Sequence, residues 1–411
     1  MSLVKITPSK KPYVYLDYAA STPIDPRVLK SMIPVMRYYY GNSLSLHQKG
    51  MEAKELLESI REGFAKILKV APQEIIFTSS ATESNNLAIK GIVMADMKNN
   101  IDKNVVTSSQ EHSSINSLCN WLEKHGLKVS KVSSTNEGLI DINHLKQLIN
   151  DNTILVSLIY VNNETGVIQP LEKIGELIQK IRQDRLEREI TTPIYFHIDA
   201  TQAFGKIAID ITKLNCDLLT ASAHKIYGPK GAALLYIKKG THLEPLIHGG
   251  GHEFGIRSST VNVPAIFGFF KAFELCQSLM KRDYRKCTSF SNKIIKILPQ
   301  KISGVHFNVP KNIRLPNIIN VRFDYIEGES LVYMLDTHHI GVSTGSACAS
   351  SFLKASETLI SMGLKPEQVG GSIRISLGRF TTKKEINYLL EILPQVVEQL
   401  RRVSPFTPAS T

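Results

Sequence analysis

The sequence is poor in cysteine and tryptophan, and it has no long apolar run. Its 411 residues include five cysteines and one tryptophan. No two cysteines form a C-x-x-C pair, which argues against a zinc site and against a disulfide framework. No apolar stretch approaches the roughly 20 residues needed to cross a bilayer, and residues 1–8 lack the apolar region of a secretory signal. We therefore expect a cytoplasmic protein without a membrane partner.

The composition that remains is that of a globular enzyme. Hydrophobic residues make up 43% of the chain and charged residues 21%, which are ordinary values for a protein with a large core. The formal net charge of +12 suggests an acidic partner such as a protein or an RNA. Basic surface is also common on enzymes, and no arginine-rich tract or RNA-binding motif supports direct nucleic-acid binding.

Strand-like and helix-like segments alternate over roughly the first 240 residues. Several of the expected strands are continuous apolar runs, as in sheets buried on both faces. The expected strands are 13–16, 75–78, 104–107, 153–161, 193–198, 217–220 and 232–237. Amphipathic helices are expected at 53–68, at 171–181 and just before Cys216. This alternation predicts an α/β fold with a mostly parallel, doubly wound sheet.

The pattern changes after Pro264. A long helix at 265–291, a strand at 317–323 and helices near 330–336 and 383–402 indicate a smaller α+β domain. We predict a large domain over 14–264 and a small domain over 265–403, on which the N-terminal segment could pack. A tail covers 404–411. The polar stretch 183–189 is typical of a solvated helix end or a surface insertion.

Lys225 lies between two apolar runs, 217–221 and 232–237. An ammonium group leaves water reluctantly, so a lysine between buried strands is costly to keep for packing alone. Lysines in such places often form Schiff bases, because desolvation favours the neutral amine. The alternative is a solvated turn residue.

Asp199 follows the expected strand 193–198 and could face Lys225 at one edge of the sheet, where open α/β sheets bind ligands. Pyridoxal phosphate needs a lysine for its Schiff base and a carboxylate beside its pyridine nitrogen. A single aspartate at a strand end is more often a cap or turn residue. The pair therefore indicates this cofactor more strongly than either residue alone.

Three further positions follow expected strands. The run 78–86 opens a helix with small hydroxyl residues, so Thr82 could help to bind a phosphate or, like Ser80, could simply cap the helix. His112 could stack on a flat cofactor, or be a hydrogen-bonded loop histidine. Asn163 could reach the phenolic oxygen of the cofactor. In a parallel sheet all of these residues fall at the same edge.

Cys348 lies in a run of small residues, 341–351. A reactive cysteine needs access, whereas an inert cysteine is buried among apolar neighbours. We therefore expect a nucleophilic thiol on a mobile loop. The other four cysteines look like ordinary core or helix residues. Arg374, in the expected strand around 372–376, could grip an α-carboxylate with two parallel hydrogen bonds or form a surface ion pair.

With Lys225, Asp199, His112, Cys348 and Arg374 together, the chain resembles the cysteine desulfurases of the nitrogenase and iron–sulfur-cluster type. These are fold-type I pyridoxal-phosphate enzymes of the class V aminotransferase superfamily. The resemblance runs from the segment 15–23 to about residue 402. It implies pyridoxal 5'-phosphate as cofactor, L-cysteine as substrate and a homodimer.

The resemblance also implies roles for single residues. Lys225 would hold the cofactor as a Schiff base, Asp199 would pair with its pyridinium nitrogen, and His112 would stack on its ring. The remaining cofactor contacts would come from Asn163 and Gln202 at the phenolic oxygen, and from Thr82, Ser222 and His224 at the phosphate. Thr260 would reach the phosphate in the partner subunit's site.

Substrate binding and sulfur transfer complete the resemblance. Asn42 and Arg374 would bind the substrate carboxylate, and Cys348 would attack the substrate sulfur to give alanine and a persulfide on Cys348. The long spacing between Cys348 and Arg374 resembles the group that delivers sulfur directly to acceptors. An iron–sulfur scaffold protein is one such acceptor, and tRNA thiolation is another use of the sulfur.

The sequence departs from the family pattern at the 41–47 segment, at Phe254, where arginine is usual, and at Ser259, where glycine is common. The segment 182–192 is also longer than usual. A selenocysteine lyase or an aminotransferase of the same fold stays open as an alternative, although an aminotransferase needs no thiol such as Cys348. A non-enzymatic scaffold would not need this set of residues.

Overall fold

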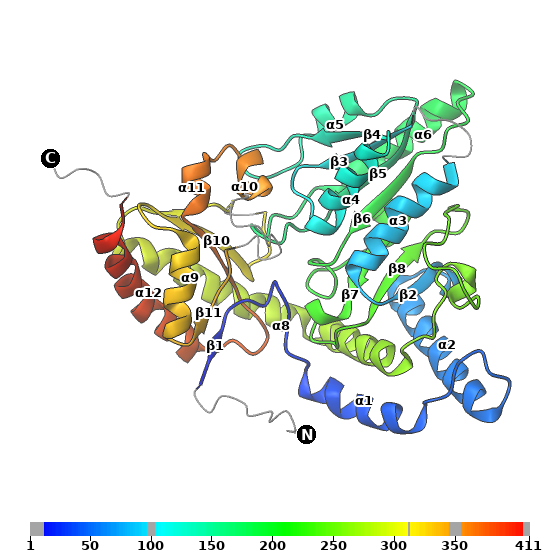
Figure 1. The fold of residues 1–411 in the computed structure, drawn as a ribbon, viewed down its shortest axis with the longest axis horizontal. Coiled ribbons are helices and arrows are strands. Elements are labelled where there is room, and N and C mark those ends of the chain that lie inside the picture. Colours follow the sequence, from blue (N-terminus) through cyan, green and yellow to red (C-terminus); the bar gives the residue numbers. More distant parts are fainter. Residues whose placement is uncertain (1–11, 97–102, 311–312, 345–354, 406–411) are drawn as a thin grey trace.

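The computed structural model describes residues 12–96, 103–310, 313–344 and 355–405 of the chain. These residues form a large part and a small part that share one 39-residue helix, α8 (Val263–Lys301). In Figure 1 the large part lies to the right of the small part, and α8 runs from one part to the other.

The large part is built on a seven-stranded sheet in the order β2-β8-β7-β6-β5-β3-β4. Neighbouring strands pair in parallel, except that β8 is antiparallel to both β2 and β7. The strands are β2 (Ile75–Thr78), β3 (Asn104–Ser108), β4 (Lys128–Val132), β5 (Thr153–Ile159), β6 (Tyr195–Asp199), β7 (Leu218–Ser222) and β8 (Ala233–Ile237). The predicted mostly parallel sheet is confirmed.

Helices cover both faces of this sheet, which is why its inner strands are apolar on both sides. Successive residues of β2 point to opposite faces: Ile75 and Phe77 pack in one core cluster, and Ile76 packs in another. The helices of the large part are α1 (Pro26–Tyr38), α2 (Gln48–Leu68), α3 (Ala81–Asp96), α4 (Ser113–Lys124), α5 (Ile142–Leu148), α6 (Leu171–Glu187) and α7 (Ile211–Leu214).

The small part holds an antiparallel sheet in the order β12-β10-β9 and a two-stranded parallel pair, β1 and β11. Through β1, the N-terminal segment therefore belongs to the small part's core. The strands are β1 (Val14–Tyr15), β9 (Val305–Phe307), β10 (Ile318–Phe323), β11 (Ile340–Gly341) and β12 (Ser372–Ser376). The helices are α9 (Gly328–Thr337), α10 (Glu357–Ser361), α11 (Pro366–Gly370) and α12 (Lys383–Val403).

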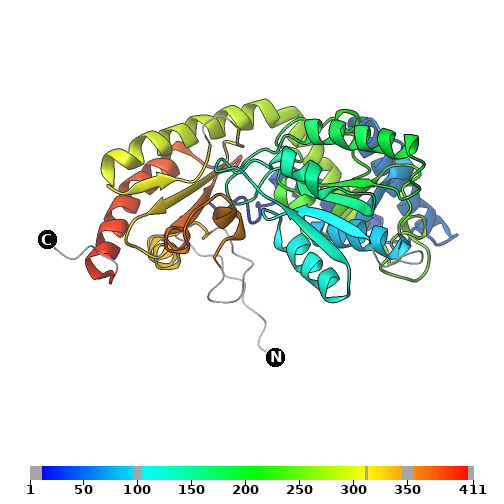
Figure 2. The same ribbon diagram turned by 90° about the horizontal axis from the view of Figure 1, so that it is seen from above.

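Helix α8 belongs to both cores (Figure 2). Phe269 and Phe273 pack in the core of the large part, whereas Ile294 and Leu298 pack in that of the small part. The large core therefore extends beyond residue 264, and the domain boundary at that position stays a prediction. By length and composition α8 could span a membrane, but 44% of its most apolar window is buried inside the protein. Its packing is that of a core helix.

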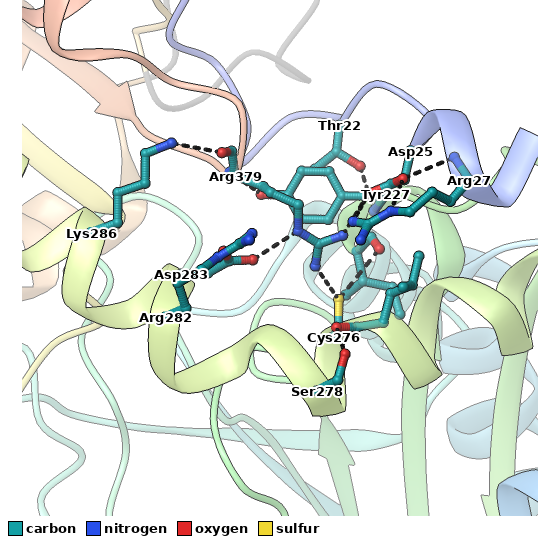
Figure 3. A network of polar contacts seen from close by, with 12 residues as sticks. Thr22, Asp25, Arg27, Tyr227, Cys276, Ser278, Arg282, Asp283, Lys286 and Arg379 are labelled. Atoms are coloured by element: carbon teal, nitrogen blue, oxygen red, sulfur yellow. Dashed lines mark hydrogen bonds and ion pairs between the residues drawn. The ribbon is translucent and has the colours of Figure 1, made fainter.

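A buried ionic network joins the two parts (Figure 3). Arg379, just after β12, donates to Asp25 Oδ2 at 3.0 Å and to Asp283 Oδ2 at 2.8 Å. Its guanidinium also lies 4.2 Å from the centre of the Tyr227 ring. Hydrogen bonds from Arg27 and from Arg379 hold the pKa of Asp25 well below its usual range. The N-terminal segment, α8 and the end of β12 are thereby tied together at one point.

Most of the predicted elements are confirmed, with shifted ends. The edge strand β4 was not predicted, because its lysines and serine do not form an apolar run. The polar stretch 183–189 is largely the end of α6 rather than an insertion. It is not fully solvated, because Arg185 is buried and donates to the carbonyl oxygens of Asn150, Thr153 and Thr192.

Candidate active site at the carboxyl edge of the large sheet

Polar residues gather where the parallel strands of the large sheet end. Asp199 is the last residue of β6, and Lys225 closes the short 3-10 turn that follows β7. His112 follows β3, and Asn163 follows β5. Since the carboxyl ends of parallel strands meet at one edge of a sheet, these four residues converge, as predicted.

Lys225 is held inside this edge by the N-terminal segment. Its Nζ donates to the carbonyl oxygens of Ala19 at 2.7 Å and Ala20 at 2.8 Å. Gln202 Nε2 donates to the same Ala19 oxygen at 2.8 Å. The ends of the Lys225 and Gln202 side chains are therefore neighbours, and Lys225 is not a solvated turn residue.

Asp199 and His112 are linked through two further side chains. Asn85 Nδ2 donates to Asp199 Oδ2 at 2.9 Å and to Ser114 Oγ at 3.0 Å. Ser114 Oγ lies 2.9 Å from His112 Nδ1. The second carboxylate oxygen of Asp199 accepts from the Thr201 N–H at 2.9 Å. Asp199 is thus fixed from both sides in a buried position.

His112 lies close enough to Asp199, Lys225 and Arg374 for their charges to affect its pKa. Burial lowers the pKa of His112 below its usual value, and the positive charges of Lys225 and Arg374 lower it further against the opposing effect of Asp199. The imidazole is therefore uncharged at neutral pH. A neutral ring at this position suits stacking on a flat cofactor, and one ring nitrogen can exchange a proton.

The polar groups beside Lys225 suit a phosphate. Ser222 is buried, and within the described part of the chain its Oγ has no hydrogen-bond partner. Burial, followed by the charge of Lys225, lowers the pKa of His224 to about 4. Thr82, in the first turn of α3, lines an open groove of about 450 Å³ together with Ser114. Ser80 Oγ caps this turn by accepting from the Glu83 N–H at 3.1 Å, so Thr82 is not the cap.

Arg374 reaches the same edge from the small part. It is 3% exposed on β12 and donates to Asp17 Oδ1 at 2.8 Å and to the Asn163 carbonyl oxygen at 2.9 Å. The alternative of a surface ion pair is wrong, because the guanidinium is buried. A carboxylate bound here would lie between the two parts of the molecule.

Two predicted residues are not brought to this edge within one chain. Asn42 lies in the exposed loop between α1 and α2, where its Oδ1 accepts from the Leu44 N–H at 3.0 Å and lies 3.4 Å from His252 Nε2. Its place beside Arg374, as implied by the resemblance, stays a prediction that would need a second copy of the chain. Thr260 is exposed beyond the turn Glu253–Gly255. Cys348 lies outside the described residues.

The structure adds residues that the sequence analysis did not select. Asn85 and Ser114 connect Asp199 to His112, Asp17 pairs with Arg374, and Lys206 Nζ donates to Gln202 Oε1 at 2.7 Å. One signal was available in the sequence: Asn85 is a polar residue among the apolar positions of α3. Asp17 and Lys206 could not be selected, because tertiary contacts alone bring them to the site.

A half-buried, hydrogen-bonded lysine and a buried carboxylate at the carboxyl edge of a mostly parallel sheet define a pyridoxal-phosphate pocket of fold type I. The chain belongs to the aminotransferase class-V family, whose model matches residues 14–389, and within it to the cysteine desulfurases of the NifS/IscS type. Enzymes of this family depend on pyridoxal phosphate.

Individual relatives agree with this assignment. The chain is 41% identical to the cysteine desulfurase IscS of Dictyoglomus turgidum, over 96% of each chain. A solved NifS-like protein superposes with a TM-score of 0.86 at 35% identity, covering 95% of this chain and all of the other. SspA, solved in complex with cysteine, has a TM-score of 0.76 at 33% identity and covers 90% of this chain and 99% of its own.

The residues present fit pyridoxal phosphate. Lys225 supplies an amine, Asp199 a fixed carboxylate, and His112 an uncharged ring, all at one edge. The buried Ser222 hydroxyl has no hydrogen-bond partner among the described residues, so it is able to donate a hydrogen bond to a ligand. A buried polar group without a partner is costly, and a bound phosphate oxygen would remove that cost.

Proposed function

We propose that this protein is a pyridoxal-phosphate-dependent cysteine desulfurase that converts L-cysteine to L-alanine and stores the sulfur as a persulfide on Cys348. The sulfur would then pass to iron–sulfur cluster assembly, with tRNA thiolation as a further use. The observation that carries the proposal is the convergence of Lys225, Asp199, His112 and Arg374 at one edge of the sheet. We further propose a cytoplasmic location.

The residues of the chain would divide the work as follows. Lys225 would bind the cofactor covalently, Asp199 would pair with its ring nitrogen, and His112 would stack on its ring. When bound, pyridoxal phosphate draws electrons from the substrate carbon atoms and so weakens the bonds at these atoms. Arg374 orients the substrate by its carboxylate, and its burial strengthens this interaction by excluding water.

Cys348 would take the sulfur. Its thiolate bonds to the substrate sulfur while the substrate's carbon–sulfur bond breaks, and the carbon that loses sulfur takes up a proton. The net change is L-cysteine plus the Cys348 thiol giving L-alanine plus the Cys348 persulfide, so no outside oxidant or reductant is required. His112, uncharged at neutral pH, is placed to move a proton near the substrate.

We also propose that the protein is a homodimer. Asn42 and Thr260, which the resemblance assigns to an active site, lie on the surface of one chain. Large apolar side chains are exposed in the same region: Ile33, Met36, Tyr38, Tyr40, Leu44, Leu46 and Phe254. Apolar patches of this kind mark protein interfaces, so a second copy could cover them and bring Asn42 and Thr260 to the partner's site.

The proposal is tested by assaying the purified protein with L-cysteine. We expect a yellow protein that releases alanine and accumulates a persulfide. Cys348→Ala should keep the cofactor absorbance and lose persulfide formation, whereas Cys216→Ala, which removes a buried thiol away from the site, should keep both. Undiminished sulfur transfer by Cys348→Ala would refute the assigned role of this cysteine.

A further inference from the structure

Lys206 is a lysine whose charge the described part of the structure leaves without a counter-ion. It lies in the turn after β6, and its Nζ donates to Gln202 Oε1 at 2.7 Å. Among the described residues no carboxylate pairs with it. The charged and titratable groups that act on it are Lys225 and Arg374, which repel its charge, and the thiols Cys276 and Cys287. Keeping such a lysine is costly unless it has a function.

The turn after β6 places the Lys206 and Gln202 side chains next to each other. Backbone hydrogen bonds run from Ala203 and Phe204 to the Ala200 carbonyl oxygen and from Lys206 to the Ala203 carbonyl oxygen. Residues four apart in such a winding lie on the same side, so the ammonium reaches the Gln202 side chain. Gly205, with φ of +70°, allows the turn to pass close to Cys276 on α8.

A lysine ammonium can only donate hydrogen bonds, whereas a glutamine amide has one donating and one accepting end. Because Lys206 donates to Gln202 Oε1, the Nε2 end must face the other way. It faces Ala19 O, at 2.8 Å, beside Lys225 Nζ. Without Lys206, the amide could turn over and present its oxygen to the cofactor side.

We propose that Lys206 is a positioning residue that locks the Gln202 amide with its N–H group directed at the phenolic edge of the cofactor. This inference rests on the proposed function, because it takes the contact between Gln202 and the cofactor from the family resemblance. Lys206 acts through Gln202 and does not touch the cofactor or the substrate. The small cavity of about 50 Å³ that it lines, together with Tyr227, Cys276 and Arg379, contains none of the residues assigned to the cofactor.

Burial and the charge of Lys225 lower the pKa of Lys206 to about 7. The orientation of the amide does not depend on this charge, because a neutral amine can also donate to Oε1. A substitution that removes the donor, rather than a change of pH, is therefore the sharper test.

The test is a double-mutant cycle on the cofactor-loaded protein in the absence of cysteine, read from the visible absorbance bands of the cofactor. Hydrogen bonds to the phenolic oxygen change the relative intensity of these bands. We expect Lys206→Met to change the band ratio at least twofold and Gln202→Ala to change it similarly. Adding Lys206→Met to Gln202→Ala should change it no further, because both remove one interaction. Lys206→Arg, which keeps a donor, should restore most of the original ratio.

Two results would overturn the inference. One is an unchanged spectrum in Lys206→Met. The other is a Lys206→Met effect that persists at full size in the Gln202→Ala background, which would mean that the charge of Lys206 acts on Lys225 directly. Lys206→Leu, which also removes the donor, serves as a second variant if Lys206→Met does not fold. A protein that binds no pyridoxal phosphate at all would instead refute the proposed function.

Discussion

The carboxyl edge of the large sheet and the arm formed by α1, residues 39–47 and residues 253–260 are built in opposite ways. At the edge, Asp199 and Arg374 are buried, Lys225 is half-buried, and all three are hydrogen-bonded within one chain. On the arm, Leu46 is 95% exposed, Tyr40 71% and Phe254 54%. The edge is formed by side chains that contact one another within one chain, whereas the arm presents apolar surface that one chain does not cover.

The arm is nevertheless held rigidly at its base. Glu253 and Phe254 have φ values of +49° and +58°, which side chains rarely adopt. The buried Glu253 carboxylate accepts from Arg61 at 2.8 Å and from the Phe77 N–H at 2.8 Å. The Arg61 guanidinium lies 4.9 Å from the Phe254 ring centre. Such a fixed exposed ring suits an interface, because little conformational freedom is lost on association.

The largest effect of a substitution is expected on activity, at the carboxyl edge of the large sheet. Lys225→Ala should abolish covalent cofactor binding and lower alanine release at least about 10³-fold, the order seen when a covalent catalyst is removed. The oligomeric state in sedimentation should not change, because Lys225 lies away from the arm. Retained activity would contradict the assigned role of this lysine.

The next largest effect is expected at the base of the arm. Glu253→Gln removes the negative charge of the ion pair between Arg61 and Glu253, whose side chains are 2% and 1% exposed, respectively. Breaking a buried pair costs about 3–5 kcal/mol, which urea unfolding would measure. Glu398→Gln, in an exposed pair with Arg402, is the matched control and should leave the unfolding curve where it was.

A smaller effect is expected on the exposed arm. Leu46→Asp should weaken dimer formation about 30-fold, corresponding to about 2 kcal/mol for a charge placed in an apolar contact. Analytical ultracentrifugation over a concentration series measures this change. Leu186→Asp, the same substitution at a 72% exposed position near the end of α6, should not affect association. Equal weakening by both variants would mean that the arm is not the interface.

The smallest effect is expected on the pH dependence of stability, from the buried residue Glu111, which precedes His112 in the sequence. Burial raises the pKa of this carboxyl from 4.5 to about 8, while hydrogen bonds from Ser108 and Ile159 oppose the shift. The folded protein therefore holds a proton that the unfolded chain releases, so stability falls as pH rises from about 4.5 to 8.

For Glu111 alone this slope is at most about 1.4 kcal/mol per pH unit. We expect Glu111→Gln to remove that loss between pH 6 and pH 7, as measured by urea unfolding at both values. Glu123→Gln, at an exposed position on α4, should retain the slope of the parent protein. A slope that is the same in Glu111→Gln and the parent would contradict the raised pKa.

Much of the fold and site could be predicted because strand ends are local features. Apolar runs located β5, β6 and β7, and the polar residues that follow these strands lie at one edge of the sheet. The edge strand β4 escaped prediction because its polar residues resemble a loop. The extent of α6 was underestimated for a similar reason: the burial of Arg185 depends on carbonyl groups from other segments.

By itself the sequence determined the chemistry that the chain carries: a lysine and an aspartate after successive buried strands, an arginine on a short strand, and a cysteine among small residues. Only the tertiary structure decided which of these residues meet. It brought Lys225, Asp199, His112 and Arg374 together, left Asn42 and Thr260 on the surface, and introduced Asn85, Asp17 and Lys206. The physical reason is that a strand order and its parallel pairing fix one shared edge, whereas contacts between distant segments leave no local pattern in the sequence.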